Sequence, residues 1–250
     1  MTDGSGRSLE ILDRFALFWD GLVVDVPPHS ATLVARLAVL DRPVHRSTVA
    51  GTLSPALTER RALGALRSAL YRVRVPVIET DGDLLCLAAD VRVDLRDAIA
   101  LARGLIHATQ PPEQIEPALD VLGRELLPND DSIWIEAERH HFRHLRLSAL
   151  DALAARLTDQ RRFAEAVEAA QLAIRVEPVS ESAEATLIRA LVAEGNAAMA
   201  RREYEEFGRR LWHDLHVRPT RRFDELLDAT SSHALVTAPS RDGGPGITPR

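Results

Sequence analysis

The stretch of the sequence with the clearest capacity for chemistry is arginine-rich: TERRALGALRSALYRVR, at residues 58–74. It holds five arginines, and the wider segment 42–74 holds seven arginines against one acid, Glu59, which gives a local charge of +6. Guanidinium groups bind phosphates and can read guanine with two hydrogen bonds. The stretch therefore suggests a nucleic-acid contact, although arginines are also typical of the solvated face of an amphipathic helix.

The chain as a whole is acidic. Its 250 residues carry 31 basic and 37 acidic side chains, a net charge of −6, and none of the basic residues is lysine. A negative total excludes nonspecific coating of nucleic acid by the whole surface, but it allows one local basic site. The exclusive use of arginine is also typical of a GC-rich genome.

Other residue patterns give weaker indications of chemistry. His140 and His144 stand four residues apart, a spacing that can chelate zinc on a helix, but no cysteine or HExxH pattern supports a metal site. Cys86 is the single cysteine, and we expect it at a buried strand position in a reducing compartment. The sequence has no glycine-rich phosphate-binding loop and no recognisable pair of catalytic carboxylates. We therefore expect no metal, no cofactor and no enzymatic activity.

Around the arginine-rich stretch, apolar periodicity predicts three consecutive helices, at residues 29–40, 45–54 and 58–74. Thr58 is a suitable N-cap for the third helix, and Pro76 ends it. One face of the third helix is an apolar stripe, made of Ala62, Leu63, Leu66, Ala69, Leu70 and Val73. The opposite face and its flanks hold the polar residues and one glycine: Arg60, Arg61, Gly64, Arg67, Ser68, Tyr71, Arg72 and Arg74.

Short strands are expected on both sides of these helices. Residues 9–27 read as strands broken at Asp13 and at an Asp20–Gly21 turn, and residues 77–87 read as a hairpin around Asp81–Gly82. Strands, three helices and a hairpin follow one another in the order of a winged helix-turn-helix. In that fold the third helix enters the major groove of DNA.

From residue 93 onward, almost every segment is predicted to be helical. The sequence that starts at Leu153 aligns with the one that starts at Leu187, and this offset of 34 residues is typical of tetratricopeptide repeats. Four alanines coincide in pairs at this offset and are expected to pack helices closely: Ala164 with Ala198, and Ala166 with Ala200.

We therefore predict a mainly α fold in which a winged helix-turn-helix domain precedes a tetratricopeptide-like helical domain. The first domain is expected at residues 8–92 and the second at residues 93–230. The tail at residues 231–250 is rich in proline and glycine, and we expect it to be disordered.

This ordered series of segments resembles the SARP family (Streptomyces antibiotic regulatory proteins), including its bacterial transcriptional activator domain. The resemblance covers roughly residues 8–229, and the segments that carry it are 41–53, 58–74, 90–95, 126–154 and 161–196. It implies a DNA-binding transcriptional regulator that activates biosynthetic or other regulated operons. Its N-terminal domain would read repeated promoter sites, and its helical domain would contact partner copies and RNA polymerase.

Carried over to this sequence, the resemblance implies two groups of DNA-binding residues. The groove-facing residues would be Arg67, Ser68, Tyr71 and Arg72, and the residues near phosphates would be Arg60, Arg61 and Arg74. The chain departs from the family pattern in having Ser54 and Ala56 in place of a tryptophan and an acid, and Ala65 in place of an asparagine. These departures leave an alternative open, a tetratricopeptide-type protein-interaction adaptor whose winged helix no longer binds DNA.

The sequence also bears on where the protein works. No apolar run reaches the ~18 residues that a membrane span needs, and residues 1–10 lack the apolar core of a signal peptide. We expect a cytoplasmic protein with no membrane contact. Its expected partners are double-stranded promoter DNA, RNA polymerase and further copies of the chain on DNA.

Overall fold

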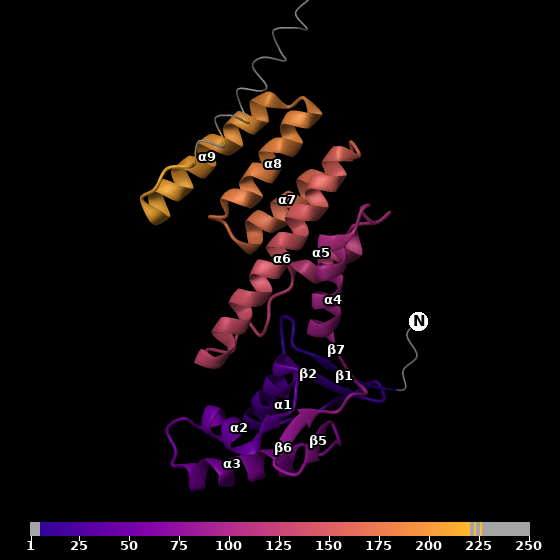
Figure 1. Ribbon diagram of the computed structural model, residues 1–250, viewed down its shortest axis with the longest axis vertical. Helices are drawn as coiled ribbons and strands as arrows, with labels where there is room; N and C mark the ends of the chain where they lie inside the picture. The colour runs from indigo at the N-terminus through magenta and orange to yellow at the C-terminus, as the bar shows by residue number, and fades with distance from the viewer. Residues whose placement is uncertain (1–5, 221–222, 224–225, 227–250) are drawn as a thin grey trace, which may run out of the picture. The chain divides into compact units, whose positions relative to one another are not determined.

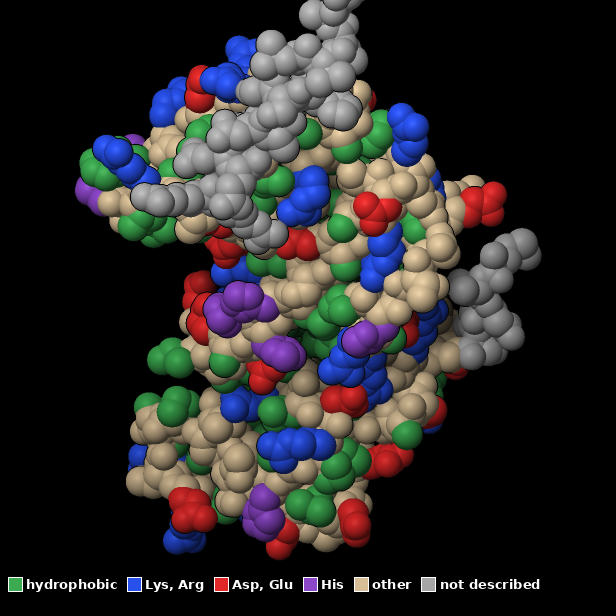
Figure 2. Space-filling model, turned by 45° about the horizontal axis from the view of Figure 1, so that its top comes forward, with side chains coloured by type: hydrophobic (Ala, Val, Ile, Leu, Met, Phe, Trp, Pro, Cys, Tyr) green, Lys and Arg blue, Asp and Glu red, His purple; other side chains and the backbone are tan. Residues whose placement is uncertain are grey.

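The computed structural model describes residues 6–220, 223 and 226, and Figure 1 shows its helices and strands. The chain divides into two compact units, Met1–Ala149 and Leu150–Arg250, and the division falls inside the long helix α6 (Ile133–Asp159). The tail predicted at residues 231–250 lies outside the described residues. Figure 2 shows basic and acidic side chains interspersed over the face that it draws. Among the helices described, none has both the length and the hydrophobicity to span a bilayer.

The first unit begins with a four-stranded sheet in the order β3-β2-β1-β7. Its strands are β1 (Arg7–Glu10), β2 (Ala16–Trp19), β3 (Leu22–Val24) and β7 (Val91–Val93). β1, β2 and β3 are antiparallel neighbours, whereas β7 pairs parallel with β1. Positive φ angles occur at Asp13 (66°) and at the turn formed by Asp20 (48°) and Gly21 (78°). The predicted breaks between the strands are thus confirmed, and the Asp-Gly pair suits its hairpin turn.

Three helices and a second, smaller sheet complete the winged helix. The helices are α1 (Pro28–Leu40), α2 (Arg46–Leu53) and α3 (Glu59–Arg72). The strands are β4 (Val44–His45), β5 (Ile78–Asp81) and β6 (Leu84–Leu87), in the order β4-β6-β5. Gly82, with a φ of 54°, makes the turn between β5 and β6. The order of elements predicted from the sequence is confirmed.

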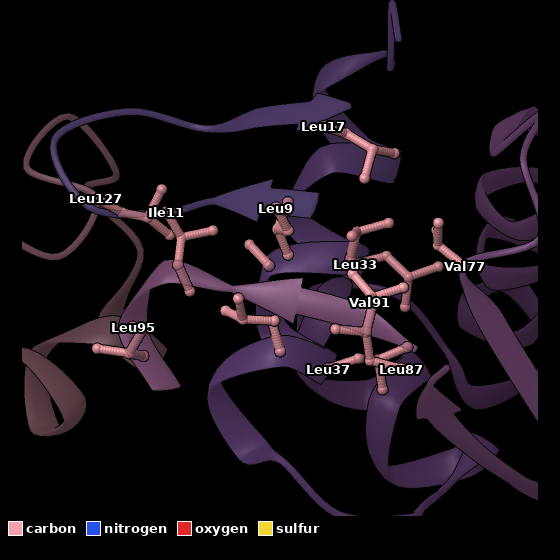
Figure 3. Close-up of a cluster of buried hydrophobic side chains, with 14 of the residues drawn as sticks. Leu9, Ile11, Leu17, Leu33, Leu37, Val77, Leu87, Val91, Leu95 and Leu127 are labelled. Atoms are coloured by element: carbon pink, nitrogen blue, oxygen red, sulfur yellow. The ribbon is translucent and has the colours of Figure 1, made fainter. Parts of the chain in front are cut away.

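One apolar cluster holds the sheet and the helices of the first unit together, and Figure 3 shows part of it. Leu9 and Leu17 of the N-terminal sheet belong to it, as do Leu33 and Leu37 of α1, and all four are at most 1% exposed. Leu66 of α3 is buried in the same cluster. Full burial of a leucine side chain contributes roughly 1.5–3 kcal/mol, so this cluster fixes the orientation of α3.

Two further helices, α4 (Asp94–His107) and α5 (Glu116–Gly123), belong to the first unit. The carboxylate of Asp94 accepts hydrogen bonds of 3.0 Å from the backbone amides of Ile11 and of Leu12. After α5 the chain runs antiparallel to the same segment: Leu12 pairs with Leu126, and the amide of Leu127 donates to the carbonyl of Ile11 at 3.0 Å. Because of these contacts, α4 and α5 belong to the same compact unit as the winged helix. The predicted domain boundary, between residues 92 and 93, therefore lies inside the first unit.

The start of α6 is bound to the loop that precedes it. The guanidinium group of Arg139 donates hydrogen bonds to the carbonyls of Leu126 (2.9 Å), Leu127 and Asp130 (2.8 Å). One arginine thus satisfies three backbone acceptors in a segment that lies between α5 and α6 and outside the named strands and helices. This contact joins the start of α6 to the segment that pairs with Ile11 and Leu12, just after β1.

In its described residues, the second unit consists of the end of α6, from Leu150 to Asp159, followed by three helices. They are α7 (Phe163–Val176), α8 (Glu181–Glu194) and α9 (Ala197–Leu215). α8 packs against both α7 and α9, and most of its residues from Ala183 to Leu191 are buried. The predicted mainly helical second part of the chain is confirmed.

Two of the four alanines predicted to pack the repeat do so. Ala166 and Ala200 are 0% exposed, whereas Ala164 and Ala198 are exposed to solvent. Each residue of an α-helix turns the chain by about 100°, so two residues that are two positions apart point to different sides. The prediction of close packing is therefore wrong for Ala164 and Ala198.

Candidate nucleic-acid interface

Helix α3 has one buried face and one exposed face. Ala62, Leu66 and Ala69 are at most 2% exposed, and Leu63 and Leu70 are partly buried against the same core. The predicted apolar stripe is therefore confirmed. The helix is held with its arginine-bearing side toward solvent.

All seven residues predicted to contact DNA are exposed, and we call them together the α3 surface: Arg60, Arg61, Arg67, Ser68, Tyr71, Arg72 and Arg74. Tyr71 is 88% exposed, which is unusual for so large a side chain. The hydroxyl of Ser68 donates a hydrogen bond of 3.2 Å to the carbonyl of Gly64 within the helix. Its oxygen lone pairs can still accept a hydrogen bond from a ligand.

Arg74 is placed differently from its prediction. The sequence periodicity put it on the third helix, but α3 ends at Arg72, and Arg74 lies two residues beyond it. Arg72 and Arg74 nevertheless line one hollow, together with Asp25 and Pro27. The structure thus keeps Arg74 beside the end of α3 without making it part of the helix.

The arginines of the α3 surface form no direct ion pairs with carboxylates of the described residues. They are Arg60, Arg61, Arg67, Arg72 and Arg74. Elsewhere in the same unit, by contrast, Arg92 pairs with Asp97 at 2.7 Å. Unpaired guanidinium groups on an exposed helix are available to bind anionic groups of a ligand.

Arg46 extends this surface, and sequence reasoning did not single it out. It is the first residue of α2 and is half-buried. With Tyr71, Arg74 and Thr80 it lines a hollow of about 520 Å³ between the end of α3 and strand β5. The charge count over residues 42–74 included Arg46, but periodicity describes one helix at a time. It could not show that the start of α2 comes close to the end of α3.

The other candidate residues for chemistry remain isolated. The Nε2 atoms of His140 and His144 lie 3.0 Å apart, so one imidazole can donate a hydrogen bond to the other. In the described part of the chain, no group of three or more histidine, cysteine, aspartate or glutamate side chains could hold a metal ion. Cys86 is half-buried on β6 and is a free thiol.

Comparison with known proteins identifies a family for most of the second half of the chain and a solved structure with a similar fold. Residues 90–229 match the family described as the bacterial transcriptional activator domain. The structure is similar to that of Mycobacterium tuberculosis EmbR in complex with a low affinity phosphopeptide, with a TM-score of 0.69. The two chains are 17% identical, and the match covers 91% of this chain and 65% of the length of EmbR in that structure. No curated protein sequence matches the chain.

Proposed function

The chain belongs to the SARP-type transcriptional regulators that carry the bacterial transcriptional activator domain, and from this we propose that it binds double-stranded promoter DNA through α3. The observation that carries the proposal is the α3 surface, whose arginines are exposed and form no ion pair among the described residues. All of them except Arg74 stand on the third helix of a winged helix-turn-helix, the element that enters the major groove in this fold.

Within this proposal, the middle and the end of α3 read the base edges. The residues assigned to this role are Arg67, Ser68, Tyr71 and Arg72. The guanidinium group of Arg67 can make two hydrogen bonds to a guanine, and the ring of Tyr71 can lie against a thymine methyl group. Both side chains are exposed and need no rearrangement of the core to reach a ligand.

The outer arginines hold the phosphate backbone. We assign this role to Arg60 and Arg61 at the start of α3, to Arg74 beyond its end, and to Arg46 at the start of α2. Phosphate contacts fix the orientation of the protein on the duplex and carry no direct sequence information. They also make the affinity depend on salt, because each contact releases counterions from the DNA.

The role as an activator is a further part of the proposal. The SARP resemblance supports reading of promoter repeats by neighbouring copies and contact with RNA polymerase, and helices α7, α8 and α9 offer a scaffold for such contacts. The proposal places the protein in the cytoplasm, because bacterial promoter DNA lies there. It assigns no catalytic role, no metal and no cofactor to the chain.

The proposal is tested by selecting duplexes from a random library with the full chain and measuring their binding by fluorescence anisotropy over a salt series. We expect salt-dependent binding that is lost in Arg60→Ala/Arg67→Ala/Arg74→Ala. The matched control is Arg175→Ala/Arg201→Ala/Arg218→Ala, which removes three exposed arginines of the second unit and the same total charge.

The competing function is that of a protein-interaction adaptor whose winged helix does not bind DNA. It rests on the departures from the family pattern at Ser54 and Ala65, both of which are half-buried rather than fully exposed. A wild-type chain that enriches no duplex and shows no salt-dependent binding would establish the adaptor. Equal loss of binding in the α3 variant and its control would show that net charge, rather than α3, is responsible.

A further inference from the structure

The hairpin that forms the wing has an acidic tip. β5 ends at Asp81 and is joined to β6 by Gly82–Asp83, and both aspartates are exposed. Among the residues that the structure describes, neither carboxylate has a hydrogen-bond or ion-pair partner. The tip therefore presents two unneutralised negative charges to solvent, in the same domain that presents the arginines of the α3 surface.

The tip is held next to the basic residues by the backbone. The amide of Arg46 donates a hydrogen bond of 2.8 Å to the carbonyl of Asp83, and β4 pairs with β6 beside this bond. Ile78 and Thr80 of β5 line the same hollow as Arg46 and Arg74. The negative tip thus has a fixed place at the border of the surface proposed to bind DNA.

Two like charges that approach each other repel, and B-DNA carries one negative charge per roughly 1.7 Å of its axis. Repulsion between exposed charges acts over a Debye length of about 8–10 Å at ordinary salt concentrations. A duplex that lies on the α3 surface can keep its backbone away from the wing tip. A duplex that docks with its backbone against the tip meets both aspartates.

We propose that the wing tip of this protein does not grip DNA but opposes the phosphate backbone, so that Asp81 and Asp83 determine specificity. The inference rests on the proposed DNA-binding function. Nonspecific binding is almost entirely electrostatic, and the protein takes many orientations on the duplex. The aspartates disfavour the orientations in which the wing faces the phosphate backbone. The pose that α3 selects by base contacts is affected least. The aspartates therefore lower nonspecific affinity more than specific affinity.

The test is the variant Asp81→Asn/Asp83→Asn in the full chain. The two-residue turn of this hairpin is Gly82–Asp83, and Gly-Asn suits such a turn as Gly-Asp does, so the wing should fold, which circular dichroism and a thermal melt would verify. The probe is a fluorescein-labelled duplex of random sequence, about 30 base pairs long, titrated at salt concentrations from about 50 to 300 mM.

We expect the variant to bind the random duplex about three- to tenfold more tightly than wild type at low salt, and the difference to shrink as salt screens the repulsion. On a selected site the gain should be smaller, so the ratio of specific to nonspecific affinity falls. The charge-matched control is Glu168→Gln/Glu205→Gln, which removes two exposed carboxylates of the second unit. The affinity of this control for the random duplex should stay within about twofold of that of wild type, because the removed charges lie on helices α7 and α9, outside the unit proposed to bind DNA.

Three outcomes would overturn the inference. Unchanged or weaker binding by the tip variant would show that the aspartates are neutral or make favourable contacts with DNA. An equal gain in the control would show that only the net charge matters. If neither wild type nor the tip variant binds any duplex, the proposed function fails as well, whereas wild-type binding without a tip effect overturns this inference alone.

Discussion

The side chain of Ser30 in α1 donates a buried hydrogen bond of 2.9 Å to the backbone carbonyl of Ala69 in α3. Ala69 is among the last four residues of α3, whose carbonyls have no partner further along the helix. The amide of Val73 bonds to Leu70 instead, at 3.2 Å. Ser30 thus supplies the partner that the helix end lacks, and it ties the proposed DNA-binding helix to α1.

We predict that Ser30→Ala destabilises the protein by ~1–3 kcal/mol, because it leaves the buried carbonyl of Ala69 without a partner. The free energy of unfolding in urea measures the effect. Ser68→Ala is the control: it removes an exposed hydroxyl of α3 and should change the stability by less than ~0.5 kcal/mol. Equal effects of the two substitutions would mean that the buried bond contributes nothing.

Arg67→Ala should weaken binding to the selected site by ~1–3 kcal/mol and relax the base preference at one position, because Arg67 is assigned a bidentate contact with guanine. Repeating the duplex selection with the variant shows the change in preference. Arg201→Ala, an exposed arginine of α9, is the control and should leave both affinity and preference unchanged. A uniform loss of affinity at all positions would instead assign Arg67 to a phosphate.

Arg74→Ala and Arg46→Ala should each weaken binding to all duplexes alike and reduce the salt slope of log K by about one unit, because each is assigned to a phosphate. The two residues line one hollow, so the double variant should show whether they hold the same phosphate. In that case its effect would be smaller than the sum of the two single effects. A changed base preference in either single variant would contradict the assignment.

Glu184 of α8 is a buried acid whose environment favours its protonated form. Burial raises the pKa of Glu184 to about 7, and the negative charges of Glu203 and Glu206 act in the same direction. Arg210 of α9 opposes this shift through an ion pair of 2.8 Å. Burial prevails because only one carboxylate oxygen has a partner, and the other, Oε1, has none among the described residues.

An ordinary glutamate titrates near 4.5, so between pH 4.5 and about 7 the folded chain holds a proton that the unfolded chain has released. The stability gained from this proton is fully present below pH 4.5 and is lost as the pH rises to about 7. Between pH 5 and pH 8 we expect a loss of roughly 1–3 kcal/mol. Urea unfolding across this range should show it for wild type and for Glu168→Gln. The loss should be absent in Glu184→Gln, and the same loss in that variant would assign it to other groups.

The sequence was sufficient to predict the series of elements and the orientation of α3, because apolar periodicity and turn residues are local signals. Leu66 and Tyr71 lie on opposite faces as their spacing requires. The position of Arg74 and the part played by Arg46 depend on where α3 ends and on how α2 meets β5. Neither is encoded in a local pattern.

The position at which the chain divides into two compact units could not be predicted from local sequence patterns either. Asp94 reads as the N-terminal residue of a helix, and nothing in its neighbourhood indicates that its carboxylate binds amides 82 and 83 positions earlier. For the same reason, the exposure of Ala164 and Ala198 could not be inferred from the repeat alone. The 34-residue offset identifies equivalent positions, but the side of the helix that is buried depends on its neighbours.

The parallel pairing of β7 with β1 has a consequence for how regulators of this type can recombine. The family segment begins at residue 90, so its first strand completes a sheet that starts at Arg7. A chimera that joins a foreign winged helix to residue 93 would remove Leu9, the native partner of Val93, and the amides of Ile11 and Leu12 that donate to the carboxylate of Asp94. A crossover inside α6 keeps both sets of contacts. Hybrid regulators, whether they arise in evolution or in the laboratory, should therefore exchange the whole first unit, which includes α6 as far as Ala149.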